Sequence, residues 1–210
     1  MVPLHRFVLA AALCAAALPL GARAQDDGVM LLVAQPAFRD LDYRETVLLV
    51  APVPSGGYVG VIINRPTRRS LASLFPEHEP SKKVIDPVYY GGPFSRSALV
   101  ALAHGHPASG DGSLPASKGL YFAFRASTID RIIETAPNSA RYFVGYVGWP
   151  EGELNDEIEH GLWSVVEADS EIAFRKNTER LWEELWQQTQ RLHADRAARL
   201  RRVSLPAARQ

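Results

Sequence analysis

The residues best suited to chemistry lie in an acidic segment, GYVGWPEGELNDEIEHGLW, at positions 145–163. It carries five carboxylates and one histidine. Glu157 and His160 stand three apart, the spacing found in half of a carboxylate-bridged di-metal site. Such a site needs a second Glu-x-x-His, and a metalloprotease needs His-Glu-x-x-His; the sequence contains neither. We therefore interpret the acids as the solvated face of a helix.

A second group of candidate ligands is the pair His104 and His106 on either side of Gly105. Two histidines in a loop without a third ligand are weak grounds for a metal site. A nucleophile elbow, a P-loop and a dinucleotide-binding glycine motif are all absent from the sequence. A glycosidase could use two of the carboxylates, but an acidic chain offers many such pairs. We predict no catalytic residue, metal or cofactor from these patterns.

The elements that would position these residues are mostly short strands. We predict strands at 29–34, 46–53, 58–64, 87–90, 97–104, 119–124, 141–148, 163–168 and 171–174. Their apolar runs are continuous, which is typical of strands buried on both faces. Pro54, Gly56 and Gly57 predict a hairpin between the second and third runs.

Three predicted helices interrupt the strands, at 127–136, 152–160 and 177–192. Ser127 and Asn177 are the expected N-caps. The last helix has an apolar stripe, formed by Leu181, Trp182, Leu185, Trp186 and Leu192. Strands outnumber helices and most neighbours are hairpin-connected, so we predict an α+β domain with a largely antiparallel sheet that curls toward a barrel.

Two tryptophans, Trp149 and Trp163, flank the acidic helix. We expect each to bury about 150–250 Å² against the sheet, so that they dock the helix while its acids stay in water. The alternative is an exposed aromatic platform that binds a ligand such as a sugar.

The first 24 residues have the features of a signal peptide. Arg6 gives a basic start, residues 7–20 are apolar, and Ala24 ends a small-residue cleavage sequence. The apolar run of 14 residues is shorter than the roughly 20 that span a membrane. We predict cleavage after Ala24, a periplasmic or secreted protein, and no transmembrane span after cleavage. The only cysteine, Cys14, would be removed with this segment, whereas a cytosolic protein with an N-terminal helix would keep it.

The formal net charge of zero hides an uneven distribution. Residues 191–210 hold six arginines and one aspartate, whereas residues 25–190 hold 15 basic and 22 acidic side chains. A basic tail can bind nucleic acid or an anionic membrane, and export would exclude nucleic acid. We interpret 25–190 as one domain and 191–210 as an Arg-rich helix extension that frays into a solvated tail.

Five segments, in order, resemble the AlgH-like (YqgE) family of small bacterial proteins. They are 31–50, 60–66, 88–94, 145–163 and 174–186. The resemblance implies one compact α+β domain around a bulged, partly open β-barrel-like sheet with flanking helices. The family is named after a proposed regulator of alginate synthesis and brings no established catalytic residue or cofactor. Its members usually look cytosolic and usually have Gln where Glu153 stands here.

Four residues of these segments are our candidates for an anion or ligand site: Asn64, Arg65, Gly91 and Gly92. Asn tolerates the left-handed backbone of a turn, and glycine permits backbone geometry closed to other residues. If the fold gathers all four around one concave surface, they could bind an anion.

Two functions from different classes follow. The first is a non-catalytic binding or regulatory protein with an unknown protein or small-molecule partner. The alternative is a hydrolase that uses carboxylate or histidine side chains. We favour the first, because the sequence offers no complete catalytic set.

Overall fold

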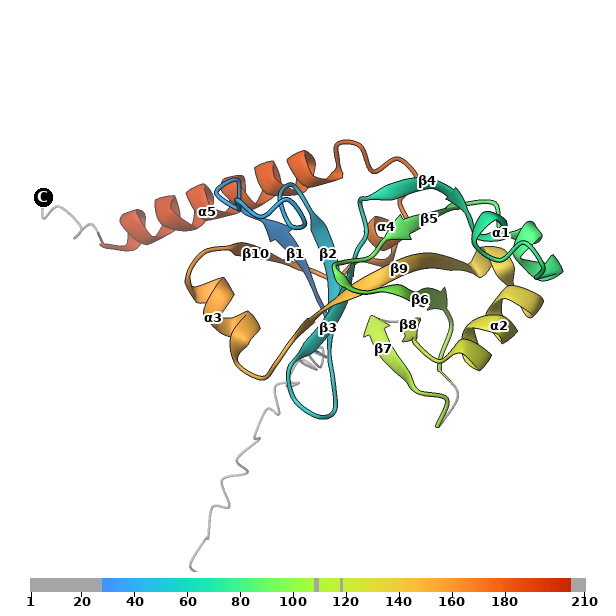
Figure 1. Ribbon diagram of the computed structural model, residues 1–210. Coiled ribbons are helices and arrows are strands. Elements are labelled where there is room, and N and C mark those ends of the chain that lie inside the picture. Colours follow the sequence, from blue (N-terminus) through green and yellow to red (C-terminus); the bar gives the residue numbers. More distant parts are fainter. Residues whose placement is uncertain (1–27, 108–109, 118, 205–210) are drawn as a thin grey trace, which may run out of the picture.

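The computed structural model describes residues 28–107, 110–117 and 119–204 (Figure 1). The predicted signal peptide at 1–24, with Cys14, lies outside these residues. The strands are β1 (Met30–Ala34), β2 (Val47–Pro52), β3 (Tyr58–Ile62), β4 (Pro66–Ser70), β5 (Pro87–Tyr90), β6 (Phe94–His104), β7 (Ser113–Ser117), β8 (Leu120–Ala123), β9 (Ala140–Trp149) and β10 (Trp163–Glu167). The helices are α1 (Leu71–Leu74), α2 (Ala126–Thr135), α3 (Glu153–Glu159), α4 (Ser170–Ala173) and α5 (Leu181–Ser204), with 3-10 turns at η1 (Glu79–Lys83) and η2 (Pro137–Ser139).

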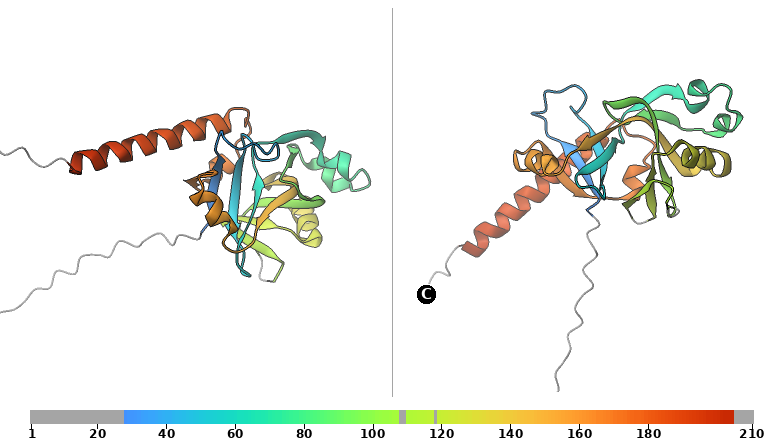
Figure 2. Two further views of the ribbon diagram at one scale, coloured as in Figure 1. Left: turned by 60° about the vertical axis from the view of Figure 1, so that its left-hand side comes forward. Right: turned by 60° about the horizontal axis from the view of Figure 1, so that its bottom comes forward.

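The strands form one sheet in the order β10-β1-β2-β3-β9-β6-β8-β7; in addition, β5 pairs with β9, and β4 pairs with β5. All pairs are antiparallel except β5 with β9. The sheet curls into a half-barrel (Figures 1 and 2). Helices α2 and α3 pack on its outer side, whereas α4 and the start of α5 join the core inside it. This confirms the prediction of an α+β domain around a partly open, largely antiparallel sheet.

Both faces of the central strands are buried, as their continuous apolar runs predicted. Leu49 and Val61 point into the half-barrel, where Phe122 and Phe143 join them. Leu48 faces the other way, toward the tryptophans beside α3. A third group packs α2 against the outside of β6 and β9. The sheet is therefore a two-sided core, and both α2 and α3 are held on its outer face.

Three local predictions were wrong. Residues 171–174 were expected to be a strand, but α4 forms there because Asp169 caps it with a hydrogen bond from the Glu171 N–H. Helix α2 begins after Arg125 rather than at Ser127, and Arg125 makes no side-chain cap bond. Asn177 caps a turn before α5 by accepting from the Glu179 N–H. Short apolar runs and polar residues near a helix start leave such boundaries ambiguous.

Two strands were not predicted at all. β4 has the sequence PTRRS and β7 the sequence SLPAS, so neither carries an apolar run. Each lies at an edge of the sheet and pairs with one neighbour, β5 or β8. Such strands are specified by the partner strand more than by their own composition. In the part of the chain that is described, no helix is both long and apolar enough to cross a bilayer.

Candidate functional site

The acidic helix α3 is docked by its tryptophans, as predicted. Trp149 is 6% exposed and Trp163 is 4% exposed, so neither forms an open platform. Glu157 lies between them and is half-buried rather than solvated. Its Oε2 accepts hydrogen bonds from Nε1 of Trp149 at 2.9 Å and of Trp163 at 2.7 Å. The prediction of a fully solvated acidic face was therefore wrong for Glu157, because two buried indoles need an acceptor.

Two more aromatic rings close this cluster. Phe38 lies 4.8 Å from Trp163 and Tyr43 lies 6.0 Å from it, both measured between ring centroids. Burial, followed by the charges of Asp40 and Glu157, raises the pKa of Tyr43 to about 12. The cluster is thus a packed joint between α3, the sheet and the loop that follows β1.

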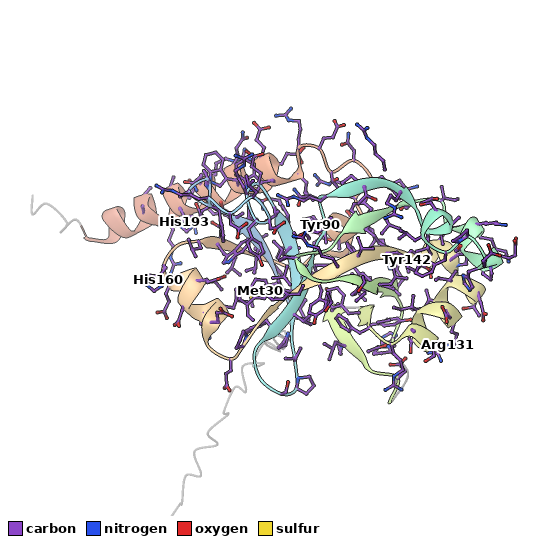
Figure 3. The ribbon with its side chains drawn as sticks, in the orientation of Figure 1. Met30, Tyr90, Arg131, Tyr142, His160 and His193 are labelled. Carbon is purple, nitrogen blue, oxygen red and sulfur yellow. The ribbon has the colours of Figure 1, made fainter. Side chains whose placement is uncertain are left out.

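The histidines that were weighed and rejected as metal ligands do not converge on a common site. His160 lies at the end of α3, where its Nδ1 contacts the carbonyl of Asp156 (Figure 3). His104 stacks on Phe174 at 4.2 Å between ring centroids. Across residues 28–107, 110–117 and 119–204, no three His, Cys, Asp or Glu side chains gather in a way that could hold a metal ion.

Asn64 and Arg65 both bind the backbone of the loop between β1 and β2. Oδ1 of Asn64 accepts from the Val47 N–H, and its Nδ2 donates to the carbonyl of Glu45. The Arg65 guanidinium donates to three carbonyls, those of Leu41, Asp42 and Arg44. Burial lowers the pKa of Arg65. The expected left-handed turn at Asn64 is not found, and its side chain fixes the loop instead.

Gly91 and Gly92 allow two backbone segments to approach each other closely. A Cβ on Gly91 would lie 2.2 Å from the carbonyl oxygen of Gly145, and one on Gly92 would lie 2.4 Å from that of Tyr146. The Ile62 N–H donates to the carbonyl of Gly91, so the glycines lie beside the end of β3. All four candidates are neighbours, but their side chains and backbones are occupied by structural contacts. Neither pocket described below is lined by any of them.

One hollow lies between the β2–β3 hairpin, β6, β7, β9 and the residue after β8. It is a pocket of about 460 Å³, lined by Val53, Val59, Ser95, Ala98, Leu99, Val100, Leu114, Phe124 and Tyr146. Only Ser95 and Tyr146 among these carry a side-chain oxygen. Ligand pockets of proteins are typically about 300–1,000 Å³, mostly apolar, and often found in the mouths of β-barrels. The size and the lining match that description.

An irregularity in β6 shapes this pocket. Phe94 pairs with Tyr146 and Leu99 pairs with Val144, so β6 has more residues than β9 over the same stretch. Ser95 sits in this bulge with φ of +47°, a conformation that is uncommon for residues other than glycine. Strained backbone of this kind is frequent at ligand sites. The bulge carries Ser95 and Ala98 into the pocket wall.

A second hollow of about 460 Å³ lies near the other end of β7 and is polar. Its wall contains Glu167, Asp169, Ser170, Ser117 and Gln188. Asp169 is already engaged as the cap of α4. The apolar pocket is the stronger candidate, since an apolar concave surface gains more from binding than a hydrated polar recess.

Arg141 was not singled out from the sequence, although it is completely buried. Its Nη1 donates to the carbonyl of Ala173 at 2.8 Å and its Nη2 to that of Arg175 at 3.0 Å. The guanidinium carbon lies 4.3 Å from the centre of the Tyr89 ring. Burial lowers the pKa of Arg141. These contacts tie α4 and the loop after it to β9. In the sequence, the only sign of them is a charged residue within the apolar run of a predicted strand.

Comparison with known proteins matches the AlgH-like family model to residues 31–193. A UPF0301 protein of Chlorobium limicola is 30% identical over 155 residues, which cover 72% of this chain and 81% of that protein. A UPF0301 protein of Streptomyces avermitilis is 32% identical over 159 residues, covering 74% of this chain and 82% of that protein.

Two solved structures are similar in fold. The solution structure of the AlgH protein from Pseudomonas aeruginosa aligns with a TM-score of 0.60 and 24% identity, covering 78% of this chain and 87% of that one. The crystal structure of protein DIP2367 from Corynebacterium diphtheriae aligns with a TM-score of 0.60 and 22% identity, covering 74% and 83%. The resemblance seen in the sequence is thereby confirmed.

Proposed function

This chain belongs to the AlgH-like family, and from that premise we propose that it is a non-catalytic binding protein that holds a small apolar molecule in the apolar pocket beside the β2–β3 hairpin. The pocket of about 460 Å³ is the observation that carries the proposal. Val53 and Val59 form one wall, and Leu114 and Phe124 face them from β7 and the end of β8. A ligand that buries apolar surface there gains about 25 cal/mol for each Å² removed from water.

The polar groups of the pocket define the kind of ligand further. The Ser95 hydroxyl and the Tyr146 phenol can each make a hydrogen bond, and no charged side chain is among the lining residues. We therefore expect an uncharged, largely apolar ligand with one polar end. A hydrolase would instead need a carboxylate or histidine in the wall, and none of the lining residues is either.

Export is the second part of the proposal. The order of basic start, apolar run and small-residue cleavage sequence in residues 1–24 supports a periplasmic or secreted protein. A cytosolic protein is the alternative. Outside the cytosol, an apolar pocket would bind a molecule supplied by the envelope or the surroundings.

The binding proposal is tested with N-phenyl-1-naphthylamine, an uncharged dye that fluoresces in apolar sites. We expect the wild-type protein to bind it saturably. Ala98→Trp should fill the pocket and weaken binding at least tenfold. Val165→Trp is the matched control, because Val165 is half-exposed on β10 and does not line the pocket. Circular dichroism and urea unfolding confirm that both variants fold. Equal dye binding by the two variants would refute the pocket as the binding site.

A further inference from the structure

Helix α5 has two parts that differ in their surroundings. Leu181, Leu185 and Thr189 are buried against the body, and Nε1 of Trp182 donates to the carbonyl of Ala34 on β1. From residue 190 to residue 199 every side chain is exposed. The backbone nevertheless stays helical to Ser204, and both views in Figure 2 show this part extending away from the body. At 1.5 Å per residue, the projecting part is about 22 Å long.

The sequence explains why the helix leaves the body. The buried stripe of α5 repeats every three to four residues, and beyond Thr189 the same positions are occupied by Leu192, Arg196 and Arg199. Arginine is almost never fully buried unless it is paired. The stripe that docks the first part therefore becomes a charged surface in the second part. The helix predicted at 177–192 thus continues to Ser204.

The projecting part of α5, residues 190–204, is strongly basic and is called the rod from here on. Residues 191–204 contain five arginines and one aspartate, whereas residues 25–190 have a net charge of −7 from 15 basic and 22 acidic side chains. None of the ion pairs within the described residues includes Arg191, Arg196 or Arg199. The molecule thus carries an excess of positive charge on one projecting element and an excess of negative charge on the rest.

The rod also lies outside the shared fold. The AlgH-like family model ends at residue 193, close to the point where α5 leaves the body. The docked part of α5 completes the core of the family fold, and the rod contributes nothing to that core. Its exposed and concentrated positive charge is available to a partner outside the molecule.

We propose that residues 190–204 of α5 dock on the surface of an anionic lipid bilayer. Arginine side chains next to a bilayer are attracted by acidic headgroups, and apolar side chains beside them enter the interface. Leu192 is 59% exposed, which places a large apolar side chain among the arginines. The acidic body is repelled by the same surface, so the rod is the part that makes contact and the body stands off.

The composition of the rod favours a bilayer over the other anionic partners. A second copy of the chain offers carboxylates for the arginines, but its exposed large apolar side chains, such as Leu41, Ile85 and Phe94, come from separate segments of the fold. Nucleic acid would meet the arginines equally well, but not at the location proposed for this protein. The bilayer satisfies both the charge and the apolar side chain.

Vesicle co-sedimentation tests this proposal. The chain from Gln25 to Gln210 is used, because it contains every described residue and lacks the apolar segment 7–20, which would bind lipid itself. We expect binding to mixed phosphatidylcholine and phosphatidylglycerol vesicles, little binding to phosphatidylcholine alone, and loss of binding at high salt. Arg196→Glu combined with Arg199→Glu should weaken binding to the mixed vesicles about tenfold or more.

The matched control is Arg68→Glu combined with Arg69→Glu. Both arginines are exposed on β4, so this variant has the same net charge but an unchanged rod. It should bind the mixed vesicles within about threefold of the wild type, a small effect expected of charges far from the surface. Equal weakening by both double variants would overturn the proposal, since it would show a general charge effect. A salt-sensitive dimer in sedimentation velocity without vesicle binding would overturn it in favour of a second copy.

Discussion

Trp163 donates a 2.7 Å hydrogen bond from its indole nitrogen to Oε2 of Glu157, six residues earlier in the chain. Trp149 donates to the same oxygen. One carboxylate oxygen therefore satisfies two buried donors that come from β9 and β10. The acid that looked most like half of a metal site is instead the connection between α3 and the sheet.

Glu157→Ala should destabilise the protein. Glu157→Ala leaves two buried donors without an acceptor at about 1–3 kcal/mol each, so we expect a loss of about 2–6 kcal/mol in the free energy of unfolding. Glu157→Gln keeps an acceptor oxygen and should lose less. Equilibrium unfolding in urea measures both. Glu159→Ala, an exposed change on the same helix, should stay within about 0.5 kcal/mol of the wild type. Equal midpoints for Glu157→Ala and Glu159→Ala would contradict the bridging role.

Trp163→Ala should also destabilise the protein. Truncation of a buried tryptophan removes its packing and leaves a cavity, which typically costs about 3–5 kcal/mol. A lower urea midpoint with an unchanged denaturant slope is the expected result. Val165→Ala on the same strand is the control and should cost less than about 1 kcal/mol, because Val165 is half-exposed. A shift below about 1 kcal/mol for Trp163→Ala would argue against the anchoring role.

Alkaline pH should weaken the protein through Tyr43. Its pKa is raised from the ordinary value of 10.0 to about 12, first by burial. A group whose pKa is higher in the folded state contributes its full stability below pH 10 and loses it as the pH rises toward 12. Tyr43→Phe cannot ionise, so its urea midpoint should fall less between pH 8 and pH 11. Parallel losses in the wild type and the variant would show that Tyr43 does not contribute.

Cell fractionation should find the protein in the envelope or outside the cell. We expect N-terminal sequencing of the purified protein to begin at Gln25, because the bond after Ala24 has small residues on its N-terminal side. Ala24→Arg should block cleavage and leave a longer, membrane-bound form. A cytosolic protein that retains Met1 would refute export.

The strands with apolar runs could be predicted because burial on both faces leaves a direct mark on composition. β4 and β7 could not, since Pro66 and Ser113 are fixed by pairing with Tyr89 of β5 and Ala123 of β8 rather than by their own preferences. The tryptophans beside α3 were recognised as anchors from size alone. The half-burial of Glu157 was missed because it depends on where β9 and β10, which are not neighbours in the sheet, place the indoles of Trp149 and Trp163.

The pocket was out of reach of the sequence for a different reason. It exists because β6 slips in register between Phe94 and Leu99, and no local pattern of residue types marks that slip. The conformation of Ser95 is likewise imposed by its neighbours. Conversely, Asn64 and Arg65 were candidates for an anion or ligand site, yet most of their hydrogen bonds hold the loop between β1 and β2 in place.

The position of β1 in the sheet has a consequence for how the chain is made. β1 lies between β2 and β10, and Met30 pairs with Glu167 of the last strand. One edge of β1 therefore stays open until nearly the whole domain is available, and an open edge invites pairing with other chains. On the proposed export route, the first strands would wait on the far side of the membrane for the last one. During that interval the β1 edge would be exposed to pairing with other chains.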